Sequence, residues 1–196
     1  MMENWLTLSP WPGLLFWTLI YLSDYWFTIK VAGMYRANPH FEFEGSLELT
    51  PQFEKDVDAL KPVSKRHITL LVITDIILLA LWWLFSLLGN TSGFALFLGI
   101  FILLEVSVHL RHFRSYFMLT QNQSKGGLEG KLYYRRWFIF GNSAFEFLSI
   151  AVVFLFTALL TSSLFFLGGG LACLSLALNH YRRRRQLYEQ VSGSLK

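Results

Sequence analysis

Four carboxylates interrupt the long apolar stretches of this sequence: Asp24, Asp75, Glu105 and Glu146. Each of them lies in a different stretch. A charged side chain in hydrocarbon is costly, so such groups usually face the interior of a helix bundle, where they pair with one another or with an ion. The four side chains are therefore the first candidates for a functional site.

The four carboxylates are expected at a similar depth in a membrane. The separation between each of them and the flanking Lys or Arg is 6 to 10 residues, which is about 9–15 Å along a helix. His109 and His112 follow Glu105 by four and seven residues, so these three side chains share one helix face. The sequence predicts a polar layer in the cytoplasmic half of the membrane or near its midplane.

This combination of residue types suits a cation. Carboxylate oxygens and imidazole nitrogens bind divalent metals such as zinc, iron and manganese, and the same groups relay protons. We predict a candidate cation or proton site formed by the following residues: Asp24, Asp75, Glu105, His109 and Glu146. The alternative is that these side chains only join helices by hydrogen bonds. The spacing itself is unspecific, because the Glu-x-x-His pair of di-iron bundles is not repeated here.

The elements that must position these residues are transmembrane helices. The chain has 196 residues, of which 54% are hydrophobic and 15% charged, against roughly a quarter charged in soluble domains. Five stretches are long enough to cross a bilayer, and they cover residues 14–34, 68–88, 94–110, 137–160 and 164–179. We predict an all-α integral membrane protein, a single five-helix transmembrane bundle.

The boundary between the last two stretches follows from length. Residues 137–179 in one helix would measure about 65 Å, twice the roughly 30 Å of the hydrocarbon core. A turn at the polar residues 161–163 gives two spans of sufficient length. A turn at Gly168 to Gly170 would leave the last span too short, so these glycines are expected inside a helix that packs closely on a neighbour.

Basic residues indicate the orientation. All 17 Lys and Arg residues lie in or beside the segments 37–66 and 111–136 or after the fifth stretch, whereas segments 1–13, 89–93 and 161–163 carry only Glu3 as a charge. Positively charged loops stay in the cytoplasm. The sequence predicts a multi-pass protein of the plasma (inner) membrane with its N-terminus outside and its C-terminus in the cytoplasm. The basic charge is explained by this topology rather than by nucleic-acid binding.

The two cytoplasmic segments differ in character. In segment 37–66, Phe53, Val57 and Leu60 repeat at helical spacing before Pro62, which predicts a short amphipathic cytoplasmic helix between the first two spans. Residues 40–45 alternate between aromatic and acidic side chains and are expected to be extended. Residues 120–127 are polar and contain glycine, which indicates a flexible connection.

Three classes of function remain open from the sequence. The first is handling of a cation or proton at the carboxylate and histidine residues. The second is an intramembrane metal-dependent enzyme that acts on a lipid, and the third is a non-enzymatic subunit whose buried charges pair with a protein partner or a second copy of the chain. Beyond the bilayer itself, the run Arg182 to Arg185 could contact anionic lipid headgroups. The single cysteine, Cys173, excludes an internal disulfide.

Overall fold

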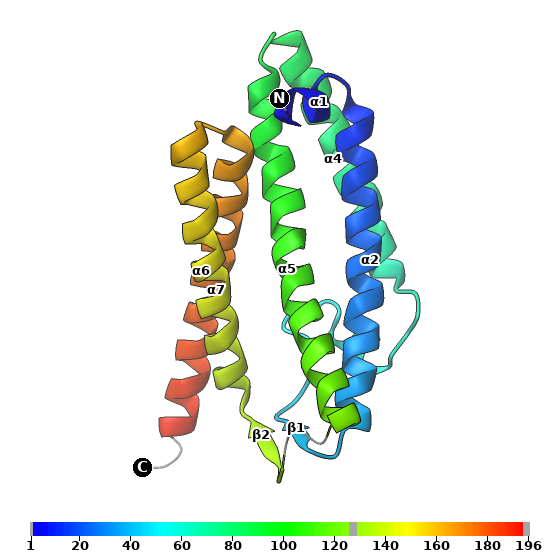
Figure 1. Ribbon diagram of the computed structural model, residues 1–196, viewed down its shortest axis with the longest axis vertical. Helices are drawn as coiled ribbons and strands as arrows, with labels where there is room; N and C mark the ends of the chain where they lie inside the picture. Colours follow the sequence, from blue (N-terminus) through cyan, green and yellow to red (C-terminus); the bar gives the residue numbers. More distant parts are fainter. Residues whose placement is uncertain (1, 126–128, 194–196) are drawn as a thin grey trace.

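The computed structural model describes residues 2–125 and 129–193 and forms an elongated helix bundle (Figure 1). Its elements, in chain order, are α1 (Met2–Thr7), α2 (Pro10–Ala37), β1 (Phe41–Phe43), α3 (Glu54–Asp58), α4 (Lys65–Leu87), α5 (Thr91–Lys125), β2 (Leu132–Tyr134), α6 (Arg136–Thr161) and α7 (Leu164–Gly193). The α6–α7 pair packs on one side of α5, and α2 and α4 pack on the other. The prediction of an all-α bundle is confirmed.

Four helices are long and apolar enough to cross a membrane: α4, α5, α6 and α7. Their outer surfaces are apolar, which suits lipid rather than water. On α4, for example, Leu78 is fully buried but Ile76 is 60% exposed. Only a small share of the apolar side chains of α4 is thus covered by protein.

Helix α2 is not among these four, although its 28 residues are ample in length. Its tyrosine, tryptophan, serine and threonine residues lower its mean hydropathy. It nevertheless runs beside α4 and α5 (Figure 1) and contributes Leu14, Trp17 and Tyr21 to the core that it shares with these helices. Its position is therefore the one expected of the first span.

The helices continue well beyond the predicted spans. Helix α5 ends at Lys125 and α7 at Gly193, so Arg111, Arg114 and the run Arg182 to Arg185 lie on helices rather than in loops. Of the predicted flexible connection, residues 120–125 are helical and 126–127 fall outside the described residues. Arg111 and Arg114 are three residues apart on α5, so their side chains lie on one face of the helix and both reach α6.

The turn between α6 and α7 lies where the sequence predicts it. Helix α6 ends at Thr161 and α7 begins at Leu164, and Ser162 adopts a left-handed conformation (φ +51°) that reverses the chain. The glycines of α7 lie within the helix. A Cβ atom on Gly168 would approach the carbonyl oxygen of Leu96 in α5 to 2.0 Å, so only glycine permits this contact between the two backbones.

A small structure joins the helices at the end of the bundle opposite α1 (Figure 1). Strands β1 and β2 pair in parallel, with Phe41 opposite Leu132. The one-turn helix α3 is shorter than the sequence predicts, and it is tied to the start of α6 by an ion pair of 3.0 Å between Glu54 and Arg136. The hydrogen-bonded guanidinium of Arg136 lowers the pKa of Glu54. The segment 37–66 therefore folds back onto the bundle.

Candidate functional site

Helices α2 and α5 meet through polar side chains halfway along the bundle. Ser23 Oγ lies 2.8 Å from His109 Nε2, and Thr28 Oγ1 lies 3.0 Å from His112 Nε2. The residues on α5 repeat every three or four positions, which keeps them on the face that α2 covers. The two helices therefore pack through hydrogen bonds at this level, whereas the core nearer to α1 is apolar.

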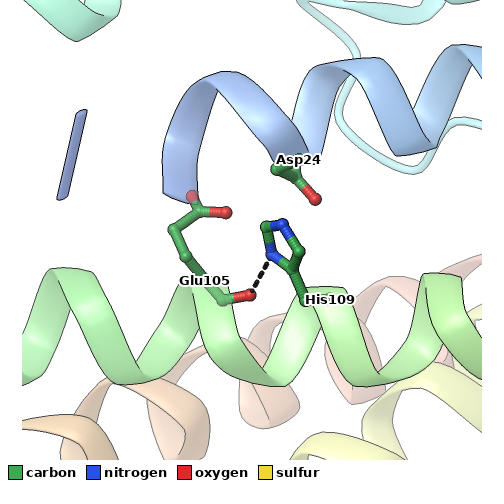
Figure 2. A group of neighbouring side chains, drawn as sticks. All are labelled: Asp24, Glu105 and His109. Carbon is green, nitrogen blue, oxygen red and sulfur yellow. Dashed lines mark hydrogen bonds between the residues drawn. The ribbon is translucent and has the colours of Figure 1, made fainter. Parts of the chain in front are cut away.

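Asp24, Glu105 and His109 converge at the centre of this interface (Figure 2). One ligand atom from each of the three lies within 4.8 Å of the others, and all three side chains are partly buried. Figure 2 shows the His109 ring below the two carboxyl groups, with Asp24 reaching down from α2. Ligands of one zinc ion lie roughly 3.4 Å apart, so small side-chain rotations would let all three bind the same ion.

The hydrogen bonds of His109 leave two arrangements of its protons. Nδ1 lies 2.9 Å from the carbonyl oxygen of Glu105 and must donate to it, because a carbonyl only accepts. Ser23 has a single hydroxyl proton, which it donates either to the carbonyl oxygen of Ile20, at 2.9 Å, or to His109 Nε2. In the first case Nε2 must itself carry a proton, and His109 is then a cation. In the second case His109 is neutral.

Two carboxylate oxygens of the cluster are buried without a hydrogen bond from the described residues: Asp24 Oδ1 and Glu105 Oε2. His112 Nε2 lies 3.3 Å from Asp24 Oδ1 without forming a hydrogen bond to it. Buried polar atoms are nearly always paired, and those that are not commonly mark a functional group. The two oxygens therefore have capacity for a ligand.

Asp75 of the predicted site lies apart from this cluster. Both of its oxygens are 3.4 Å from Thr18 Oγ1 of α2. Thr18 precedes Asp24 by six residues, which is about 9 Å along the helix axis. Asp75 thus joins α4 to α2 at another level of the bundle.

Glu146 of the predicted site pairs with cations instead. It lies on α6 and forms ion pairs with two arginines of α5: Arg111 Nε is 3.0 Å from Glu146 Oε2, and Arg114 Nη1 contacts Glu146 Oε1. The Arg111 guanidinium also lies over the ring of Phe147, 5.1 Å from its centroid. These two ion pairs link α5 to α6 beside an open space in the bundle.

That space is a cavity of about 970 Å³. Three of the four carboxylates of the predicted polar layer line it, each from a different helix: Asp24 from α2, Glu105 from α5 and Glu146 from α6. Most of the remaining lining is aromatic or aliphatic, with Trp17 and Phe101 among its members. Residues of the segment after β1, such as Leu47 and Phe53, also contribute to it. Two of the three clustered residues, Asp24 and Glu105, thus face a cavity that could admit a second molecule.

Sequence reasoning missed three residues of this region: Ser23, Arg111 and Arg114. Both arginines follow the predicted span 94–110, and from the sequence they count only as positive charges on the cytoplasmic side. The signal that could have found them is helical spacing, because Arg111 and Arg114 are three residues apart and share a face. Ser23 had no distinguishing pattern, since serine is common in such helices.

Comparison of the chain with protein families, curated proteins and solved structures finds no match. The basis for a function is therefore the geometry of the cluster and the cavity. The cluster supplies two carboxylates and an imidazole at the distances given above, and the cavity supplies space beside them.

Proposed function

We propose that the protein is a five-span membrane protein that binds a divalent cation at Asp24, Glu105 and His109, in competition with protons. The observation that carries this proposal is the convergence of two carboxylates and one imidazole, with buried oxygens of both carboxylates lacking a hydrogen bond from the described residues. A cation would satisfy these oxygens and offset their mutual repulsion. If these side chains only joined helices by hydrogen bonds, Asp24 Oδ1 and Glu105 Oε2 would be expected to accept hydrogen bonds, and none of the described residues donates one to either.

The donor set favours a transition metal. Two carboxylate oxygens and one imidazole nitrogen suit zinc, manganese or iron, whereas calcium and magnesium prefer oxygen alone. The hydrogen bond from Nδ1 to the Glu105 carbonyl leaves Nε2 of neutral His109 as the ligand atom, in the manner of many metal-binding histidines. His112 Nε2 lies 3.3 Å from Asp24 Oδ1 and can hold that carboxylate in position.

Protons compete for the same groups. His109 binds a metal only when Nε2 is unprotonated, and metal binding therefore releases a proton from the cationic form. The hydroxyl of Ser23 can donate either to the carbonyl oxygen of Ile20 or to His109 Nε2, so it is compatible with both forms of the ring. Cation affinity is therefore expected to fall as the pH is lowered.

Calorimetry with Mn²⁺ and Zn²⁺ on metal-stripped protein in neutral detergent tests the proposal. We expect one saturable site per chain, weaker at lower pH. Asp24→Asn should weaken binding by more than about a hundredfold, a loss larger than that of an outer-shell partner. The matched control is Asp75→Asn, which changes an intramembrane aspartate outside the cluster and should bind as the parent does. Absence of binding, or an equal loss in both variants, would contradict the proposal.

In the proposed topology, α2 crosses the membrane as the first of five spans, the N-terminus is outside and the C-terminus is cytoplasmic. The support is charge: Arg36 near the end of α2 and Arg136 at the start of α6 lie at helix ends close to β1 and β2, and Lys65 lies at the end of α4 that points the same way (Figure 1). Positive residues at one end mark the cytoplasmic side.

Fusions after Lys196 test this topology. A fluorescent protein fused there should be bright, and alkaline phosphatase at the same position should be inactive, since phosphatase folds only outside the cytoplasm. Phosphatase fused after Ser162, in the α6–α7 turn, should be active. Activity of the C-terminal phosphatase fusion would reverse the orientation.

A further inference from the structure

The cavity between α5 and α6 opens to the outside of the bundle. Three lining residues are also exposed on the outer surface. Phe145 of α6 is 72% exposed and Met118 of α5 is 39% exposed. The side chain of Arg114, also on α5, is 66% exposed. In the proposed topology these helix faces meet lipid. One opening is therefore lateral, toward the cytoplasmic leaflet, and the exposed lining residues Thr50 and Gln52 mark a second opening on the cytoplasmic side.

Two arginines lie at the lateral opening, and the carboxylates of Glu146 and Glu48 line the cavity beside them. Arg111 and Arg114 share a single carboxylate, Glu146, and form no other ion pair with the described residues. Two guanidiniums offer ten N–H donors between them, far more than two carboxylate oxygens can accept. The remaining donors are in the fork arrangement that binds phosphate oxygens in pairs.

Deeper in, the cavity is suited to hydrocarbon. Its lining includes Phe147, Phe101, Leu104 and Trp17, which continue from the arginines toward the middle of the bundle. The lining thus combines two arginines near the lateral opening with apolar side chains and, at Asp24 and Glu105, two carboxylates. A volume of about 970 Å³ is at the upper end of the range for ligand pockets, roughly 300–1,000 Å³.

We infer that this cavity binds a phospholipid of the cytoplasmic leaflet with an anionic headgroup, whose phosphate contacts Arg111 and Arg114 and whose acyl chain lies along Phe147 and Phe101. The lateral opening admits the lipid from the bilayer, and the two arginines lie at headgroup level in the proposed topology. Glu146 orients the arginines when no lipid is bound and gives way to the phosphate when one is. Because these residues are not the cation ligands, the inference does not rest on the proposed metal site.

Native mass spectrometry of the full chain in neutral detergent provides the test, with phosphatidylglycerol, phosphatidylcholine and inorganic phosphate as probes. We expect one saturable phosphatidylglycerol site, a weaker response to phosphatidylcholine and none to inorganic phosphate. Arg114→Gln should reduce phosphatidylglycerol affinity about tenfold, the equivalent of one charge-assisted hydrogen bond. Arg114 is chosen because its exposed side chain can be removed without unfolding the chain.

Two further variants separate the cavity from a general basic surface. Arg183→Gln removes a cation from the exposed part of α7 that does not line the cavity, and it should leave affinity unchanged. Asn142→Trp fills the cavity from α6 and should abolish saturable binding while the circular dichroism stays that of the parent. Equal losses in Arg114→Gln and Arg183→Gln, full binding in Asn142→Trp, or comparable binding of inorganic phosphate would each overturn the inference. Metal-stripped protein should bind the lipid as well as metal-loaded protein does, so failure of the metal site leaves this test intact.

Discussion

Replacement of Glu146 by alanine is expected to lower the free energy of unfolding by about 3 kcal/mol. The variant leaves Arg111 and Arg114 facing each other without a counter-charge, and Arg111 has only 27% of its side chain exposed. Breaking a buried ion pair costs about 3–5 kcal/mol, and the partial exposure of Arg111 places the cost at the lower end. Thermal unfolding in detergent, followed by tryptophan fluorescence, measures the change.

The matched control for this prediction is Arg114→Ala. It removes the other half of the same interaction, but the Arg114 side chain is 66% exposed and returns to solvent or headgroups. Its cost should stay below about 1 kcal/mol, the usual limit for exposed pairs. If Glu146→Ala unfolds no more readily than Arg114→Ala, the ion pair does not join α5 to α6. Added phosphatidylglycerol should restore part of the stability of Glu146→Ala, since its phosphate replaces the lost carboxylate.

Glu105→Gln is expected to change stability and cation response in opposite directions. Without metal, the variant should be more stable by about 1 kcal/mol, because a neutral amide removes a partly buried charge that faces Asp24 and has an unpaired oxygen. With Mn²⁺ at about a hundred times the dissociation constant, the parent should gain about 2.7 kcal/mol. The variant should gain about 0.4 kcal/mol at most, because a hundredfold loss of affinity brings the dissociation constant up to the metal concentration. Melting curves with and without metal give both values.

A purely structural role for Glu105 predicts a different pattern. In that case Glu105→Gln would keep whatever small metal response the parent shows. The double variant with His109→Ala adds a second measure: neighbours four residues apart that bind one ion should give strongly non-additive losses of metal-induced stability. Additive losses would show that Glu105 and His109 do not act on the same cation.

Much of the secondary structure follows from local rules. Helix length forces a turn between α6 and α7, and the polar residues at 161–163 mark its place, so this boundary could be predicted. The grouping of Glu105 with His109 follows from helical periodicity on α5 in the same way. Depth counting also places Asp24 at the level of Glu105, and the structure brings the two together.

Rotation of one helix relative to another could not be predicted in this way. Periodicity states which residues share a face of one helix, but not which neighbour that face meets. Asp75 contacts Thr18 rather than the cluster because α4 meets α2 near Asp24 with His67, which stacks on Tyr21, and Asp75 lies eight residues further along α4. Glu146 contacts arginines because α5 continues as a helix past the predicted end of its span, which turns Arg111 back toward α6.

The α6–α7 hairpin touches α5 directly at Gly168, and a tilt of the hairpin around this contact would displace residues further along α7. At Gly168 the two backbones touch with no side chain between them, whereas His180, twelve residues later on the same helix, lines the cavity. Twelve residues correspond to about 18 Å, so a rotation of the hairpin by about 5° around the glycine contact displaces His180 by about 1.6 Å. The position of His180 in the cavity wall is in this way sensitive to the tilt of the hairpin around Gly168.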